Sequence, residues 1–185
     1  MIDVIEITIE DFKENIYNEY VKLFPKEEQR DWKKIENTYK NGIEKFYKIV
    51  LEDITIGFFM LEKINDNYPF YLDYFAIFNK FQNKGYGSKA INILLDKIII
   101  NDGLIGEVEK EDLNNPLTIR RLKFYAKLGF KKAESEYLLY NVLYVPILNI
   151  RIKELNKVEI DKIFFDYYKT NCGEYEVKNK CIIIK

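Results

Sequence analysis

The stretch YLDYFAIFNKFQNKGYGSKAINILL, residues 71–95, decides the fold of this chain. The apolar run at 70–78 predicts a strand, and a loop that contains Gly85 and Gly87 follows it. Helical spacing of apolar residues begins directly after the loop. A helix that starts in this way points free backbone N–H groups and its positive end at whatever lies above the loop. An anion fits there, most obviously a phosphate.

The segment after the loop continues with one more strand and one more helix. Apolar residues from Ile91 to Ile99 recur at positions i, i+3, i+4, i+7 and i+8, and a short strand is expected at 104–109. Asn115-Pro116 opens the next helix, and Gly129 is well placed to cap its C-terminus. The side chains expected on one side of that helix are Leu117, Arg121, Phe124, Tyr125 and Leu128.

The N-terminal third predicts two helices between strands. A strand is expected at 2–7, and a helix that starts at Thr8 carries Phe12, Ile16, Tyr20 and Leu23. A second helix is expected to begin at Pro25, with Trp32, Ile35 and Tyr39 on one face. The segments 44–52 and 55–64 then predict a hairpin.

The C-terminal part predicts two strands, at 134–142 and 144–152, and then an additional segment. Asn156 and Glu159 are typical of a helix start, and Ile160, Ile163, Phe164 and Tyr167 follow in register. The last dozen residues, which include Ile182, Ile183 and Ile184, predict a final strand. The aromatic run Phe164, Phe165, Tyr167 and Tyr168 is expected to pack back on the domain, and a homodimer surface is the alternative.

Composition narrows the class of protein. The chain has 185 residues, 48% apolar residues and a formal charge of -1, which predicts one domain with a sizeable core. Interspersed charges make nucleic acid a poor partner, and no apolar run is long enough for a membrane span or a signal peptide, so a cytoplasmic protein is expected. Cys172 and Cys181 are expected to be reduced thiols. Without histidine, acid–base chemistry has to use carboxylates, tyrosines, lysines, cysteines, backbone or water.

Three kinds of phosphate loop can be compared with residues 82–90. A P-loop requires Gly-Lys-Ser/Thr, whereas here the order is Gly87-Ser88-Lys89. The dinucleotide fingerprint has a shorter lead-in and an acidic residue about 20 positions later, which this chain does not supply in the required place. The third pattern, Gln-x-x-Gly-x-Gly, is present from Gln82 to Gly87. An ordinary strand–turn–helix without a ligand is the remaining alternative.

The third pattern resembles the acyl-CoA loop of the GCN5-related N-acetyltransferase (GNAT) superfamily. A second motif resembles the same family: the helix that ends in Phe124-Tyr125-x-x-x-Gly129-Phe130. The resemblance implies an α+β fold, with a mostly antiparallel central sheet, a splayed parallel strand pair at 71–77 and 104–109, and flanking helices. It also implies an acetyltransferase domain at 1–152, with 153–185 as a C-terminal helix and strand extension packed on the same domain.

The resemblance further implies acetyl-CoA as co-substrate, with no metal. The loop N–H groups would hold the pyrophosphate, and a backbone N–H around Phe75 to Ile77 would polarise the thioester carbonyl. The positions expected to contact acetyl-CoA are Phe75, Ala76, Ile77, Gln82, Asn83, Lys84, Gly85, Tyr86, Gly87, Ser88, Asn115, Arg121 and Tyr125.

The acid–base residues come from the same comparison and from strand alternation. Tyr125 would protonate the departing thiolate. Alternation puts Glu107 and Glu109 on one face of the strand at 104–109, and these carboxylates are the best candidates for accepting the proton of the amine or for holding it. Asp73 is the third candidate.

Two departures from the family pattern concern the CoA arm. Many members have an asparagine seven residues before the tyrosine, where this chain has Thr118, and the nearest asparagines are Asn114 and Asn115. Arg121 replaces a small residue, and it is expected to pair with Glu107 or Glu109 or to reach the CoA.

Two classes of function follow. The first is an enzyme that moves an acetyl group from acetyl-CoA to a primary amine by direct attack, with a small cationic amine slightly favoured over a peptide amine as acceptor. The second is a non-catalytic acyl-CoA-binding sensor or interaction module.

Overall fold

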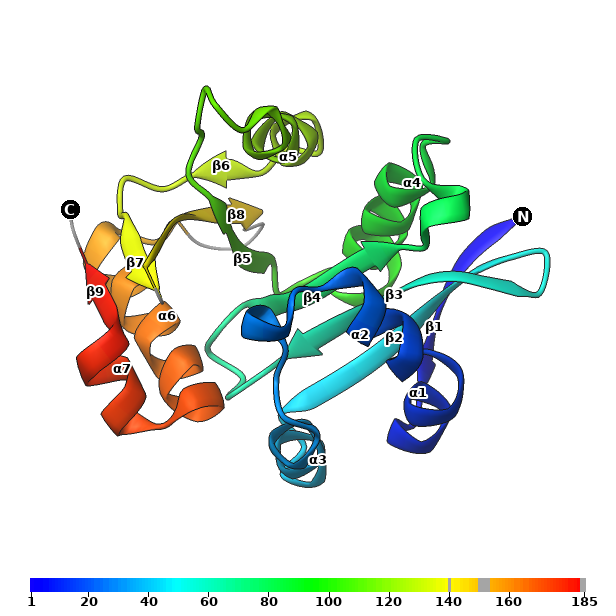
Figure 1. The fold of residues 1–185 in the computed structure, drawn as a ribbon, viewed down its shortest axis with the longest axis horizontal. Coiled ribbons are helices and arrows are strands. Elements are labelled where there is room, and N and C mark those ends of the chain that lie inside the picture. The colour runs from blue at the N-terminus through cyan, green and yellow to red at the C-terminus, as the bar shows by residue number, and fades with distance from the viewer. Residues whose placement is uncertain (140, 150–153, 184–185) are drawn as a thin grey trace. The chain divides into compact units, whose positions relative to one another are not determined.

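The computed structural model describes residues 1–139, 141–149 and 154–183. The chain divides into two compact units. The first comprises Met1–Asp66 and Leu72–Ile100, and the second comprises Asn67–Tyr71 and Asn101–Lys185. Each unit is described by itself below, and Figure 1 labels their elements.

The first unit is an antiparallel sheet with helices on both faces. Its strands are β1 (Ile2–Ile7), β2 (Glu44–Leu51), β3 (Ile54–Glu62) and most of β4 (Phe70–Ile77). Its helices are α1 (Ile9–Asn15), α2 (Tyr17–Leu23), the 3₁₀ turn η1 (Lys26–Glu28), α3 (Trp32–Lys40), the 3₁₀ turn η2 (Asn79–Phe81), α4 (Tyr86–Ile93) and the π-helical turn η3 (Leu94–Ile98). The strands lie in the order β1-β2-β3-β4.

Strand alternation sorts the core of the first unit into two layers. Phe46 pairs with Met60 across β2 and β3, and both side chains are fully buried in a cluster with residues of α1, α2 and α3. The neighbouring positions Tyr47 and Phe59 point to the opposite face. In Figure 1, α4 lies across the sheet from α1, α2 and α3. The predicted apolar stripe of α4 and η3 is confirmed, because Ile91, Leu94, Leu95 and Ile99 are all buried.

The N-terminal helices differ from the prediction. Thr8 caps α1 as expected and accepts a hydrogen bond from the Asp11 N–H at 3.2 Å. The single predicted helix is interrupted at Ile16, whose φ of -124° is not helical. The helix predicted to begin at Pro25 begins instead at Trp32. The Asp31 side chain accepts a hydrogen bond from the Lys33 N–H and so caps α3, whereas Pro25 supplies no side-chain cap.

The second unit has its own sheet and three helices. Its strands are the start of β4, β5 (Leu104–Glu109), β6 (Lys131–Lys132), β7 (Tyr137–Leu139), β8 (Val142–Asn149) and β9 (Cys181–Ile183). Its helices are α5 (Pro116–Lys127), α6 (Lys157–Cys172) and α7 (Glu174–Lys180). In the order β4-β5-β8-β7-β9, β4 and β5 are parallel and the other pairs are antiparallel, and β6 also pairs with β8.

The parallel pair that the sequence predicts is present. In the described residues, Phe70 pairs with Leu104 and Tyr71 pairs with Ile105. The two strands are therefore paired only at their N-terminal ends. A mostly antiparallel sheet with one parallel pair and flanking helices confirms the predicted α+β fold class.

Two expectations for the second unit need correction, and part of two others is not tested. The strand predicted at 134–142 is shorter and ends at Leu139, and Val142 belongs to β8, because Asn141 turns the chain with a φ of 69°. Residues 150–152 of the other predicted strand, and Ile184 of the final one, lie outside the described residues. The face expected on α5 is confirmed at Tyr125, which is buried, but it is wrong at the start of the helix, where Leu117 is 60% exposed and Thr118 is buried instead.

The C-terminal extension packs on the sheet of the second unit. Asn156 and Glu159 form the predicted capping box at the start of α6. Ile160, Ile163, Phe164 and Tyr167 are buried as predicted. The Tyr167 ring stacks on Tyr71 of β4 with centroids 4.8 Å apart. Helix α7 was not predicted, and β9 follows it against β7.

Two findings concern the chain as a whole. Cys172 and Cys181 form no disulfide. No helix in the part of the chain that the structure describes has the length and the apolar character needed to cross a membrane.

Candidate active site

The glycine loop of the first unit ends in an uncapped helix N-terminus. Gly85 is the N-cap of α4 with φ 78° and ψ 2°, and as a glycine it supplies no side-chain cap to the first turn. This left-handed conformation favours glycine, and a Cβ at Gly85 would meet no atom within 4 Å. The N–H groups of Tyr86, Gly87 and Ser88 therefore begin a helix without a side-chain cap, as an anion-binding turn requires.

The residues before Gly85 hold the loop in place. The Gln82 side-chain amide donates to the carbonyl oxygen of Ile77 at 2.8 Å and so ties the loop to the end of β4. Asn83 has a φ of 62°, a second left-handed residue two positions before Gly85. Lys84 Nζ donates to the Lys80 carbonyl oxygen at 3.1 Å. The structure thus gives Gln82 a structural role, whereas the sequence pattern predicted a contact with acetyl-CoA.

A close backbone approach shapes the segment of β4 predicted to meet the thioester. A Cβ built on Gly57 of β3 would lie 2.3 Å from the carbonyl oxygen of Ala76. Only glycine fits at that distance. The Phe75 ring stacks on Phe59 with centroids 4.6 Å apart. Sequence reasoning missed Gly57, although an isolated glycine in an apolar strand is a recognised sign of close backbone approach.

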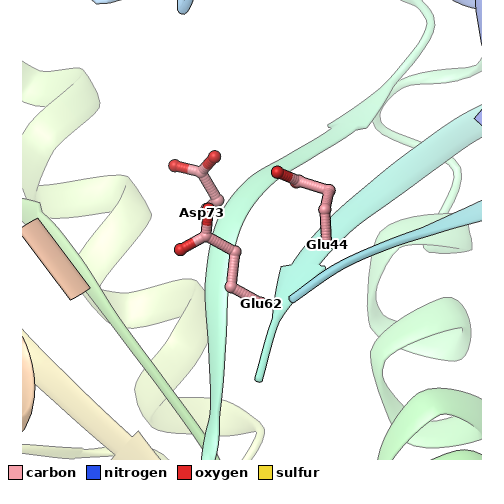
Figure 2. Close-up of side chains that lie close together, drawn as sticks. All are labelled: Glu44, Glu62 and Asp73. Carbon is pink, nitrogen blue, oxygen red and sulfur yellow. The ribbon is translucent and has the colours of Figure 1, made fainter. Parts of the chain in front are cut away.

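Asp73 belongs to a buried ion-pair cluster of the first unit. Arg30 Nη1 lies 2.5 Å from Asp73 Oδ2, 2.7 Å from Glu44 Oε2 and 2.8 Å from Glu62 Oε1. Arg30 Nη2 also donates to Thr38 Oγ1 at 2.8 Å. Figure 2 shows the three carboxylate side chains gathered from β2, β3 and β4.

Among the described residues, the acidic side chains of this cluster outnumber their ion-pair partner Arg30. Three carboxylates surround one guanidinium, and the Glu44 and Glu62 side chains have no exposed area. Burial raises the pKa of Glu44 to about 7, against the opposing effect of Arg30. Burial also raises the pKa of Asp73. The same three carboxylates could in principle hold a metal ion. The Arg30 guanidinium already contacts an oxygen of each carboxylate, so we assign Arg30, rather than a metal ion, as their positive partner.

Glu107 of the second unit is held by a tyrosine. The Tyr71 hydroxyl donates to the Glu107 carboxylate, with both oxygens 2.6 Å away. Tyr71 is 3% exposed. A hydrogen bond from a buried phenol orients the carboxylate and stabilises its ionised form. Sequence reasoning missed Tyr71 because nothing distinguishes it among 15 tyrosines.

Glu109 and Arg121 form an ion pair, as one of the alternatives predicted. Arg121 Nη1 lies 3.0 Å from Glu109 Oε1, and both side chains are partly exposed. Asn115 caps α5 by accepting from the Leu117 N–H at 3.3 Å. The Thr118 hydroxyl, which stands at the usual asparagine position of the family, donates to the Asn115 carbonyl oxygen at 2.8 Å.

Tyr125 lies on the buried side of α5. Its side chain is 8% exposed and packs edge-on against Phe124 and Phe130. Burial raises the pKa of Tyr125 far above its usual value, with Arg121 opposing and Glu107 reinforcing the shift. The phenol is therefore protonated throughout the neutral range, which is the form that a proton donor needs.

Comparison with known proteins identifies the family. The profile of the acetyltransferase (GNAT) domain matches residues 42–132, a range that contains both the glycine loop and Tyr125. This chain carries a GNAT acetyltransferase domain. The predicted family and the predicted enzyme class, an acyltransferase, are confirmed. The sequence matches none of the curated proteins with which it was compared.

Solved structures show the same fold. An acetyltransferase of Bacteroides thetaiotaomicron assigned to the GNAT family is 22% identical, with a TM-score of 0.75, and the match covers 92% of this chain and 98% of that one. A GNAT acetyltransferase of Elizabethkingia anophelis with acetyl-CoA bound is 15% identical, with a TM-score of 0.61 over 81% and 98% of the chains. The ribosomal-protein-S18-alanine N-acetyltransferase of Escherichia coli is 16% identical, with a TM-score of 0.60 over 85% and 97%.

Proposed function

We propose that this GNAT protein transfers the acetyl group of acetyl-CoA to a primary amine by direct attack. The observation that carries the proposal is the uncapped N-terminus of α4 within the segment that matches the GNAT domain. The solved GNAT structure from Elizabethkingia anophelis contains acetyl-CoA, which supports the same co-substrate here. The N–H groups from Asn83 to Ser88 would bind the pyrophosphate.

The proposed reaction removes two protons from the amine nitrogen and adds one to the departing thiolate. Glu107 accepts a proton from the protonated amine, whose nitrogen then attacks the thioester carbonyl and forms a C–N bond. A backbone N–H around Phe75 to Ile77 stabilises the oxyanion that develops. The oxyanion collapses, the C–S bond breaks, and the departing thiolate takes a proton from Tyr125. The nitrogen of the new amide then loses its second proton, which restores the Tyr125 phenol, and Glu107 releases its proton to solvent. Glu109 and Asp73 are alternative bases, although each already has an arginine as ion-pair partner.

The proposed acceptor is chosen from the negative charge of the candidate site. Carboxylates supply the candidate bases, and this favours a small cationic amine. A peptide N-terminus is the second candidate, since the similar Escherichia coli enzyme acts on an alanine of ribosomal protein S18. A non-catalytic acyl-CoA-binding module remains the alternative function, and a cytoplasmic location is part of the proposal.

Two measurements test the proposal. Calorimetry with acetyl-CoA should give micromolar binding that Gly87→Trp abolishes, because an indole would fill the space above the loop. Transfer is then followed with a panel of spermidine, tyramine and a peptide with an N-terminal alanine. Tight binding with no transfer to any amine would favour the non-catalytic module, and no binding of acetyl-CoA or CoA would overturn both functions.

A further inference from the structure

The surroundings of Glu107 extend into the C-terminal segment, beyond the residues that match the GNAT domain. Its hydrogen-bond partner Tyr71 contacts two rings of α6. Tyr71 stacks on Tyr167 at 4.8 Å and meets Tyr168 edge-on at 6.4 Å. The Tyr167 hydroxyl donates to the Pro69 carbonyl oxygen at 2.6 Å, which anchors α6 beside the start of β4.

Tyr168 places a second phenol in this cluster. Its side chain is 7% exposed, and its hydroxyl oxygen is buried without a hydrogen-bond partner among the described residues. Burial raises the pKa of Tyr168 well above its usual value, and the Glu107 charge is the next largest cause. A buried phenol that lacks a partner is unfavourable unless a nearby group accepts its proton. Glu107 is the charged acceptor that acts on it most strongly.

The negative charge of Glu107 also acts on other groups of the second unit. Glu107 also contributes to the raised pKa values of three groups on different elements: Tyr125 of α5, Tyr137 of β7 and Cys181 of β9. The hydroxyl of Tyr137 already donates to Asp161 at 2.7 Å, and Tyr125 has the proposed role of acid. Among the described phenols near Glu107, Tyr71 and Tyr168 are thus the two that we assign to holding the carboxylate.

We propose that Tyr71 and Tyr168 are positioning residues for Glu107, and that the C-terminal segment is thereby part of the catalytic apparatus. One phenol comes from the start of β4 and the other from α6. Together they orient the carboxylate and keep it ionised, so that it is ready to accept the proton of an amine. This inference rests on the proposed function, in which Glu107 is the base.

The test is the proton affinity of Glu107, measured without any substrate. Glutamate labelled with ¹³C at the side-chain carboxyl gives a resonance for Glu107 that Glu107→Gln identifies, and its titration is followed by NMR. Tyr71→Phe should tighten proton binding by about tenfold, because the carboxylate loses a charge-assisted hydrogen bond. Tyr168→Phe should tighten it by a smaller factor. In both variants the acidic limb of the acetyl-transfer rate should move to higher pH.

Tyr167→Phe is the matched control. It removes a hydroxyl from the same helix next to Tyr168 and keeps the ring that stacks on Tyr71, but its hydroxyl donates to a carbonyl rather than to Glu107. Its Glu107 titration should match that of the wild type. The inference is overturned if Tyr71→Phe and Tyr168→Phe leave the titration unchanged, or if Tyr167→Phe moves it equally. A wild type that transfers no acetyl group would overturn the proposed function, and the titration would still decide how the carboxylate is held.

Discussion

At the scale of single residues, the environment of Tyr125 suits its proposed role as proton donor. Burial keeps the phenol protonated at neutral pH. Tyr125→Phe should therefore lower the rate of acetyl transfer by roughly 100-fold, the usual range for loss of a general acid, while acetyl-CoA affinity changes little. Steady-state kinetics and calorimetry measure the two effects separately. Tyr39→Phe, a partly buried tyrosine of α3, serves as control, and a Tyr125→Phe enzyme with the wild-type rate would remove the proposed role.

At Gly57, the backbone of the neighbouring strand β4 leaves no room for a side chain. A Cβ would lie 2.3 Å from the Ala76 carbonyl oxygen, so Gly57→Ala has to displace β4. We expect a loss of about 2 kcal/mol in the free energy of unfolding, within the range found for overpacked positions. Urea denaturation measures it. Gly42→Ala is the comparison, because Gly42 has open space but a φ of 72°. An alanine at 57 that costs no more than one at 42 would contradict the close approach.

The two residues also show what a sequence can reveal at this scale. Tyr125 could be proposed as a site residue because it stands in a motif, Phe-Tyr-x-x-x-Gly-Phe, whose spacing is fixed along the chain. Tyr71 and Arg30 were missed because their partners Glu107 and Asp73 lie 36 and 43 positions away. A long-range hydrogen bond leaves no local pattern, and such a contact becomes visible only when the strands are paired.

At the scale of elements, local signals predicted what local interactions determine. Caps and apolar periodicity placed α4, α5 and α6 correctly, since Gly85, Asn115 and Asn156 stand at their N-caps. Boundaries set by single backbone angles were missed, at Ile16 and Asn141. The burial of α5 is shifted by one residue, from Leu117 to Thr118. The hydroxyl of Thr118 is satisfied by Asn115 and Asp112, which makes its burial tolerable.

The capping box of α6 gives a prediction for this element. Asn156 accepts from the Glu159 N–H at 3.0 Å, and Glu159 accepts from the Asn156 N–H at 2.9 Å. Asn156→Ala should lower the free energy of unfolding by about 1 kcal/mol, the usual cost of losing such a cap. Asn37→Ala, at an exposed position within α3, should cost nothing. Thermal unfolding of the two variants compares them, and equal melting temperatures would show that the capping box does not stabilise α6.

At the scale of the whole molecule, the unbalanced charge around Arg30 should govern how stability depends on pH. Glu44 has a pKa of about 7 in the folded protein and 4.5 as its ordinary value. A raised pKa means that the folded protein binds the proton more tightly than the unfolded chain. The stabilisation from the protonated form is complete below about pH 4.5 and is lost as the pH rises to about 7. The groups that face Glu44 are Arg30, Thr38, Glu62 and Asp73, and the raised pKa of Asp73 acts in the same direction.

Glu44→Gln isolates this contribution, because the amide is neutral at every pH. The melting temperature of the wild type should fall between pH 5 and pH 8. The variant should show a smaller fall, and its disadvantage at pH 5 should shrink or reverse at pH 8. Asp11 and Asp161 have lowered pKa values, so they titrate below this pH range and do not contribute to the fall. Glu36→Gln, at an exposed pair with Lys40, is the control and should follow the wild-type curve. Parallel curves for Glu44→Gln and the wild type would mean that Arg30 neutralises the cluster without a bound proton.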